Sequence, residues 1–313
     1  MKSNGTTRVV MLGTGTPRPD PDRAGPATAI VVNDTPYLID FGTGVIRRTT
    51  AAYEKGVIAL GYGGVNIKTA FLTHLHSDHT VGYPDLIFTP WTMGRKEPLE
   101  VYGPKGIKAM TEHVLMAWQV DTETRVSGVD PKNSTGCNAT AHEIAPGVIY
   151  QDRNVTVTAF SAHHATVDSF SFRFDTPGRT IVISGDTSPT QSLLDNSRGC
   201  DVLVHEVYSM ADFQRDSPQF QEFRSRYHTS SIELAQIANT VKPGLLILYH
   251  RGNRAGGPVT CEMDDILLAE IRRTYAGEVV AARDLDIFYS LLIPRKQTSA
   301  DRAVMSQMGQ KLP

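Results

Sequence analysis

The sequence predicts an α/β protein, and two patterns along the chain carry that prediction. Short apolar runs typical of buried strands alternate with longer segments that have helix start and stop signals. Acidic or imidazole residues follow the C-terminal ends of at least five of these apolar runs. In layered sheets covered by helices, binding sites lie at this edge, so we expect the functional site there.

The apolar runs predict ten strands, which we expect to form one domain over residues 1–313 without internal repeats or linkers. They cover residues 8–12, 28–32, 37–40, 69–72, 99–102, 155–160, 170–174, 180–183, 201–204 and 245–249. Helices are expected near residue 45 and over residues 81–88, 105–118, 229–241 and 262–275. Residues 121–141 are rich in Gly, Ser, Thr, Asn and Pro and predict an irregular surface insertion, and the chain is polar from Arg295 onward.

Residues 33 and 34 separate two apolar strands and predict a β-hairpin turn. Asp40 ends the second strand of this hairpin. Two roles are open for its carboxylate: it can cap the helix that begins near Val45, or it can orient a metal ligand.

A dense group of metal-capable side chains directly follows the strand over residues 69–72. It contains His74, His76, Asp78 and His79 within six residues. His74 and His76 are two positions apart, so in extended chain they face the same side. A polar loop with hydrogen-bonded histidines is the simpler alternative, but imidazole and carboxylate at this density favour a divalent ion such as zinc.

The composition excludes several classes of protein. The chain has 313 residues, 40% of them hydrophobic and 20% charged, which indicates a globular core. A net charge of −2 gives no overall basic field, so any RNA-binding role would need a local basic patch. Three scattered cysteines and the absence of a signal peptide or membrane-spanning run predict a cytoplasmic protein without a disulfide framework.

The motifs of this chain resemble those of the metallo-β-lactamase superfamily. They are the H-x-H-x-D-H cluster, a later histidine, the segment Ser184-Gly185-Asp186-Thr187, and a last histidine after an apolar strand. The ribonuclease Z and arylsulfatase-like branch is similar in further segments, which are residues 12–17, residues 38–42, His205-Glu206-Val207-Tyr208 and His228-Thr229-Ser230. The resemblance covers roughly residues 8–292.

The resemblance implies a four-layer αββα sandwich with two divalent metal ions at one edge. One ion would take His74, His76 and His164, the other would take Asp78, His79 and His250, and Asp186 would bridge them. His163 competes with His164 for the third imidazole position, and the spacing from the preceding strand favours His164. Zinc is the expected metal, Mn²⁺ and Fe²⁺ suit the same donors, and a metal-bridging hydroxide would attack the substrate.

Three residues are expected to take part in catalysis by the same resemblance, namely Asp78, Glu206 and His228. Glu206 would orient His228, and His228 would protonate the leaving oxygen. The alternatives are a salt bridge for Glu206 and a position beside a helix N-cap for His228. We interpret His113, His142 and His205 as structural residues.

The expected activity is therefore that of a binuclear metal-dependent hydrolase of a phosphodiester, as in ribonuclease Z, or of a sulfate ester. The expected partners are RNA or a small-molecule ester and, by resemblance, a second copy in a homodimer. The chain lacks a P-x-K-x-R-N segment and a long arm rich in Gly, Pro and Lys, and Arg251 directly follows His250, which disfavours tRNA processing. Hydrolysis of a lactone, an amide or a β-lactam is the alternative, and a non-catalytic metal-bound RNA-binding or scaffold protein is a weaker one because the ligand set is complete.

Overall fold

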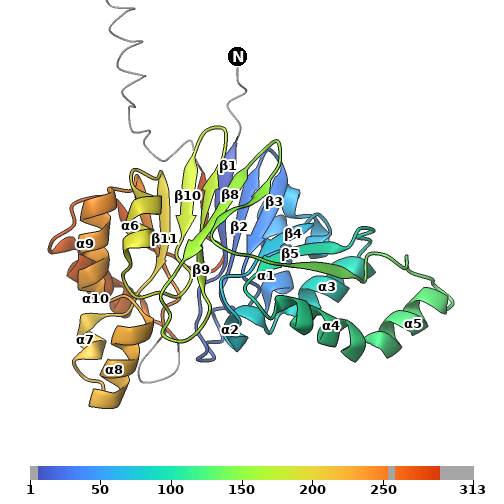
Figure 1. Cartoon of the computed structure of the whole chain (residues 1–313), viewed down its shortest axis with the longest axis horizontal. Coiled ribbons are helices and arrows are strands. Elements are labelled where there is room, and N and C mark those ends of the chain that lie inside the picture. Colours follow the sequence, from blue (N-terminus) through green and yellow to red (C-terminus); the bar gives the residue numbers. More distant parts are fainter. Residues whose placement is uncertain (1–5, 253–257, 290–313) are drawn as a thin grey trace, which may run out of the picture.

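The structure is a computed structural model, and it describes residues 6–252 and 258–289. Two mixed β-sheets pack face to face, and helices cover the outer face of each sheet (Figure 1). The predicted four-layer αββα sandwich is confirmed. The polar tail from Arg295 lies outside the described residues, as do residues 253–257, which follow His250 and Arg251 closely.

The first sheet has seven strands among the described residues, and its layer holds the N-terminal helices. Its strands in spatial order are β14 (Ile287–Tyr289), β1 (Thr7–Gly13), β2 (Ala27–Val32), β3 (Thr35–Ile39), β4 (Thr69–Phe71), β5 (Leu99–Gly103) and β6 (Ala139–Glu143). Its helices are α1 (Val45–Glu54), η1 (Ile58–Leu60), η2 (Tyr62–Gly64), α2 (Ser77–Thr80), α3 (Tyr83–Thr92), α4 (Ile107–Ala117) and α5 (Gln119–Ser127). The predicted hairpin turn is present, and Asn33 and Asp34 both have positive φ, as a type I′ turn requires.

The second sheet also has seven described strands, and the later helices cover it. Its spatial order is β13 (Val279–Ala281), β12 (Leu245–Tyr249), β11 (Val202–Glu206), β10 (Thr180–Ile183), β9 (Phe170–Asp175), β8 (Thr156–Ser161) and β7 (Gly147–Gln151). Its helices are α6 (Gln191–Ser197), α7 (Met210–Phe213), α8 (Pro218–Tyr227), α9 (Ser231–Val241) and α10 (Cys261–Arg272). Strands β10 to β13 are parallel neighbours, so their C-terminal ends lie at one edge.

Three apolar cores hold the four layers together, because the side chains of most strands alternate between two buried faces. Val9 and Met11 of β1 point into the core between the sheets, whereas Val10 and Leu12 pack in the core with α1 and α3. Phe71 sits in the central core against Phe172 and Phe174 of the second sheet. The third core packs β10, β11 and β12 against α6, α9 and α10.

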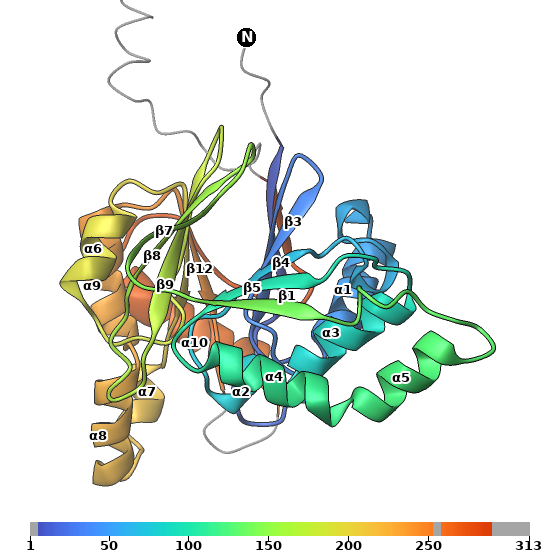
Figure 2. The ribbon, with the colours of Figure 1, turned by 45° about the vertical axis from the view of Figure 1, so that its right-hand side comes forward.

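The structure corrects two local expectations. Residues 121–141 are not irregular throughout, since α5 covers their first part and β6 their end; Arg125 bonds Asp121 one turn earlier in α5. The helix expected over residues 81–88 begins at Tyr83 and runs on to Thr92 as α3, and a separate short helix, α2, precedes it at Ser77–Thr80. Figure 2 shows α5 extending away from the sheets, and none of the helices in the described ranges is long and apolar enough to cross a membrane.

Candidate metal centre and catalytic pocket

The predicted site residues converge at the edge of the sandwich where β4, β8, β10, β11 and β12 end. The loop after β4 brings the first four donors, and its backbone is fixed because Leu72 N–H donates to the Tyr102 carbonyl. The loops after β8, β10 and β12 bring His164, Asp186 and His250, respectively. Seven donors from four segments that are distant in sequence thus meet in one cluster, and the end of β11 adds Glu206 beside them.

The donors fall into two groups that each have the size of a metal site. In the first group the facing nitrogens of His76 and His164 are 3.2 Å apart, and a nitrogen of His74 lies within 4.8 Å of both. In the second group His250 Nε2 lies 3.1 Å and His79 Nε2 lies 3.5 Å from Asp78 Oδ2. Each group can hold one ion with three nitrogen or oxygen ligands.

The carboxylate of Asp186 lies between the two groups. Its Oδ1 is 3.5 Å from His79 Nε2, and its Oδ2 is 3.5 Å from His250 Nε2 and 4.0 Å from His164 Nε2. The segment that carries it turns at Gly185, which has a φ of +61° and no room for a Cβ beside Thr73. Asp186 can therefore contact an ion in either group.

Three buried polar atoms at the centre of the cluster have no hydrogen-bond partner among the described residues. They are His74 Nε2, His79 Nε2 and Asp186 Oδ1. A buried polar atom without a partner costs about 1–3 kcal/mol, so such atoms call for an explanation. All three are good ligand atoms for a borderline divalent ion, and the donor set therefore fits the implied metals.

The electrostatics of the cluster suit bound cations. Burial lowers the pKa of His164 and lowers that of His74 well below the ordinary value, so both rings are neutral. Burial opposes the ionised form of Asp186, but the neighbouring imidazoles hold the pKa of that carboxyl well below its usual range. Burial opposes the charged ring of His79, but the charges and hydrogen bonds of Asp40 and Asp186 together outweigh it and raise the pKa of His79 well above its usual value. The cluster thus favours positive charge at its centre.

Asp40 contacts His79 and does not cap α1. Its Oδ2 accepts a hydrogen bond of 2.8 Å from His79 Nδ1, and its Oδ1 accepts bonds from the N–H and hydroxyl of Thr73. The N-cap of α1 is Gly44, which has no side-chain cap, so the capping alternative for Asp40 is wrong. Asp40 has a φ of +57°, a strained conformation that turns its carboxylate back toward the cluster.

The structure brings His164 into the cluster and leaves His163 outside it. His164 is buried, and its Nδ1–H donates to the carbonyl of Tyr227 at 2.7 Å, which leaves Nε2 as the ligand atom. His163 instead lies 2.6 Å from the hydroxyl of Ser188. His113, His142 and His205 also lie outside the cluster, where they bond Ala109 O, Glu100 Oε2 and Glu206 O, respectively.

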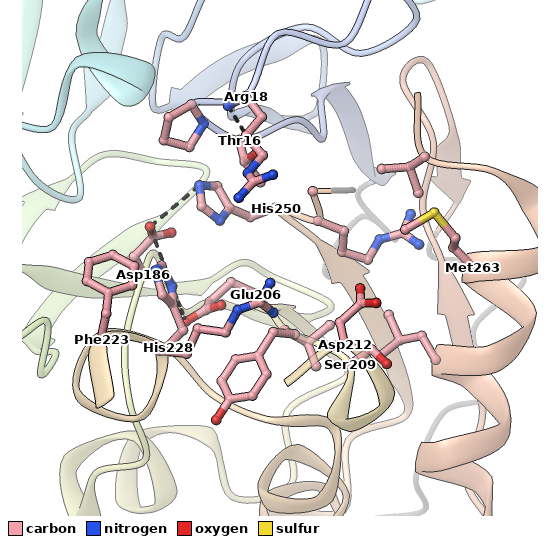
Figure 3. Close-up of a pocket in the computed structure, with 18 of the residues that line it drawn as sticks. Thr16, Arg18, Asp186, Glu206, Ser209, Asp212, Phe223, His228, His250 and Met263 are labelled. Atoms are coloured by element: carbon pink, nitrogen blue, oxygen red, sulfur yellow. Dashed lines mark hydrogen bonds and ion pairs between the residues drawn. The ribbon is translucent and has the colours of Figure 1, made fainter. Parts of the chain in front are cut away.

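Glu206 and His228 form a carboxylate–imidazole pair beside the donors (Figure 3). Buried Glu206 Oε1 lies 3.2 Å from His228 Nδ1 and also accepts from the backbone N–H groups of Thr187 and Thr229 at 3.2 Å. His228 Nδ1 is 3.9 Å from Asp186 Oδ2. Burial alone would lower the pKa of His228, but the charge and hydrogen bond of Glu206, together with the charge of Asp186, outweigh it and raise the pKa to about 9. The ring is therefore protonated at neutral pH.

A cavity of about 680 Å³ opens directly onto the donor cluster. Its walls include Arg18, Tyr208, Phe220, Phe223, Met263 and Leu267, beside the donors His76, Asp78 and His250. This volume suits a small-molecule ligand. The sequence analysis did not predict this wall. Ser217-Pro218 is a typical helix start, and aromatic residues at positions 220, 223 and 227 have the spacing of one face of a helix, so the pattern could have predicted α8.

Donors of this kind at a strand-end edge, beside a carboxylate–imidazole pair, are typical of the class of metal-dependent hydrolases. Comparison with protein families then identifies the family. The model described as "Beta-lactamase superfamily domain" matches residues 35–251, and the chain belongs to the metallo-β-lactamase superfamily.

Known relatives and solved structures agree with this assignment. The chain is 32% identical over 246 residues to a ribonuclease Z of Mycobacterium bovis, which covers 77% of this chain and 85% of the relative. It is 34% identical to a ribonuclease Z of Mycobacterium sp. strain KMS, again over 77% of the chain and 83% of the relative. The fold matches the metallo-beta-lactamase fold protein YhfI of Bacillus subtilis (TM-score 0.67, 19% identity, 91% and 100% covered) and the short form of human tRNase Z (TM-score 0.64, 21% identity, 92% and 100% covered).

Proposed function

We propose that this protein is a binuclear metal-dependent phosphodiesterase, with sulfate-ester hydrolysis as the neighbouring activity. The observation that carries the proposal is the Glu206–His228 pair, whose protonated ring lies beside a cluster with two groups of metal donors. Phosphodiesters of ordinary alcohols release a basic alkoxide, and a positioned acid helps that departure most. The similarity to ribonucleases Z supports the same bond type.

The proposal assigns one ion, zinc by preference, to His74, His76 and His164 and the other to Asp78, His79 and His250, with Asp186 shared. When bound, these ions would lower the pKa of a water molecule and neutralise charge on the scissile group. The chain's own contribution is orientation, since Asp40 holds His79 and the Tyr227 carbonyl holds His164.

His228 would donate the proton that the leaving oxygen needs. Its Nδ1 is held toward Glu206, so Nε2 is the nitrogen that carries the transferable proton. Glu206 is in turn fixed by two backbone N–H groups, which restrict the angle of the imidazole ring. His228 also lies within ligand distance of His164 and Asp186, and metal content after its removal separates an acid from a ligand.

Hydrolysis of a lactone, an amide or a β-lactam is the competing proposal. A panel of bis-p-nitrophenyl phosphate, an aryl sulfate, a lactone, a β-lactam and precursor tRNA, each tested with zinc-loaded protein, distinguishes the classes. We expect turnover of the phosphodiester. Turnover confined to the lactone or the β-lactam would overturn the proposal.

We also propose a cytoplasmic homodimer. The family resemblance suggests the dimer, and free thiols at Cys137, Cys200 and Cys261 suit a reducing compartment. Sedimentation equilibrium of the purified protein should give twice the chain mass.

A further inference from the structure

Helix α8 carries a row of aromatic rings on one side and contributes no fully buried residue to any core. The rings of Phe220 and Phe223 stack with centroids 5.5 Å apart, and those of Phe223 and Tyr227 stack at 4.5 Å. Phe220 and Phe223 line the cavity, and Phe223 is 40% exposed. An aromatic row that faces a cavity and not a core is typical of a ligand-binding surface.

The aromatic row leads directly to the proposed acid. His228 follows α8 in the chain, and its ring centroid lies 5.7 Å from that of Phe223 in an edge-to-face arrangement. Figure 3 shows Phe223 on the same side of the cavity as Asp186 and His228, with Met263 on the far side. Because His228 would protonate the departing oxygen, the group attached to that oxygen has to lie along this row.

The segment that carries the row has no net charge. Residues 209–227 contain three acidic residues (Asp212, Asp216 and Glu222) and three arginines (Arg215, Arg224 and Arg226). Arg224 bonds Asp216 at 2.9 Å, and Arg226 bonds Glu222 at 2.7 Å. A surface that tracks a polyanion would carry excess positive charge, so this wall favours an uncharged group over a nucleic-acid strand.

The opposite wall is apolar and adaptable. Helix α10 contributes Met263, Ile266 and Leu267 to the cavity, and its one charged lining residue, Asp264, is paired with Arg251. Met263 has the flexible thioether that fits ligands of varied shape. Arg224 lies over the ring of Phe220, with its guanidinium carbon 5.2 Å from the centroid, and this contact fixes the ring. The cavity therefore presents rigid rings on one side and a flexible apolar surface on the other.

We propose that the cavity between α8 and α10 binds the leaving group, and that this group is an uncharged alcohol carrying an aromatic ring. Phe223 is the residue that determines this specificity. The inference rests on the proposed phosphodiesterase activity for the statement that the bound alcohol is the leaving group. The binding of the alcohol itself does not depend on activity. The substrate class is then a small phosphodiester of an arylalkyl alcohol.

Two symmetric substrates test this specificity with zinc-loaded protein. Bis(2-phenylethyl) phosphate and diethyl phosphate release alcohols of similar basicity, and only the first carries a ring. Phe223→Ala should lower kcat/KM for the phenylethyl diester by about tenfold, the size of one aromatic contact, and leave the diethyl diester unchanged. Tyr62→Ala removes an exposed ring that does not line this cavity and should change neither value. Equal losses on both diesters, or no loss, would overturn the proposal.

A binding experiment separates this proposal from the proposed function. Saturation-transfer NMR of 2-phenylethanol with zinc-free protein should show binding that is lost in Phe223→Ala and kept in Tyr62→Ala. If neither diester is hydrolysed but this pattern holds, the phosphodiesterase proposal fails and the binding site remains. If the alcohol shows no transfer, or equal transfer with both variants, the leaving-group site is wrong. Cleavage of precursor tRNA that depends on Phe223 would indicate that the cavity stacks a nucleobase and not an arylalkyl alcohol, and this result would also overturn the proposal.

Discussion

Asp40 Oδ2 lies 2.8 Å from His79 Nδ1, so a carboxylate at the end of β3 sets the orientation of an imidazole 39 positions later in the chain. The bond leaves His79 Nε2 directed at Asp186 Oδ1, 3.5 Å away. The same carboxylate holds the backbone N–H of Thr73, next to His74. Asp40 is not itself a donor, but it positions the segment that carries His74 and His79.

Replacing Asp40 with Asn should weaken metal binding without removing a ligand. The amide is neutral and cannot accept from both His79 and Thr73 as the carboxylate does, so we expect about 10- to 100-fold lower zinc affinity. Competition with a chromophoric chelator measures it. Asp152→Asn is the matched control, because Asp152 accepts from Tyr37 Oη in a partly buried network outside the donor cluster. Wild-type affinity in Asp40→Asn would contradict the orienting role.

Asp186 should matter more than any single histidine, since its two oxygens face both donor groups. The wild-type protein should carry close to two equivalents of metal per chain, as measured by elemental analysis. His76→Ala should lose metal and activity together, through the first group. Asp186→Ala should weaken both sites and abolish turnover. An Asp186→Ala protein that retains two equivalents and normal rates would refute the shared position.

The pair of Arg251 and Asp264 should stabilise the segment that carries His250. Both side chains are buried and bonded to each other, and burial lowers the pKa of Arg251 to about 10. Asp264→Ala would leave that guanidinium without its carboxylate, so the free energy of unfolding should fall by about 3 kcal/mol. Urea denaturation measures the change, and Asp265→Ala, an exposed neighbour, should cost far less.

The donor cluster could be predicted from the sequence because the donors lie in segments that follow apolar strands and because their motifs resemble those of the superfamily. His74, Asp186 and His250 all follow strands whose ends meet at one edge of the sandwich. The position of each residue after its strand therefore indicated that these residues lie close together in the fold. The role of Asp40 could not be decided in this way. Capping and orienting residues both occur at a strand end, and only the fold places Asp40 against His79.

The wall of the cavity was not predicted for a different physical reason. Helix α8 has no fully buried residue, and its Arg226 pairs with Glu222 on the same helix. Its sequence therefore resembles that of an ordinary polar surface helix. The rings of Phe220 and Phe223 become a cavity wall only because the fold brings α10 to the other side of the same cavity. The helical start of residues 121–141 was missed for a similar reason, since α5 has no buried residue and draws support from local pairs such as Gln119 with Glu123.

The leaving group should decide how much His228 matters. An aryl phosphodiester releases a stabilised phenolate and needs little protonation, whereas an alkyl diester releases a basic alkoxide. His228→Ala should therefore cost about 10²–10⁴-fold on an alkyl diester and much less on bis-p-nitrophenyl phosphate. Metal content should be unchanged, and His113→Ala, an exposed histidine outside the cluster, should behave as wild type. Equal losses on both substrates would mean that His228 is not the acid for the leaving group, and loss of an ion would mean that it is a ligand.

The pH dependence of activity tests the role of Glu206 in the Glu206–His228 pair. The carboxylate of Glu206 raises the pKa of His228 to about 9, so the ring keeps its proton below that pH and loses it as the pH rises further. Glu206→Gln removes this negative charge, so the pKa of His228 should fall and the alkaline loss of activity on an alkyl diester should begin at lower pH. NMR titration of His228 in zinc-free protein measures the shift directly, because bound ions add their own positive charge. A pKa that is unchanged in Glu206→Gln would show that Glu206 does not hold the proton on this ring.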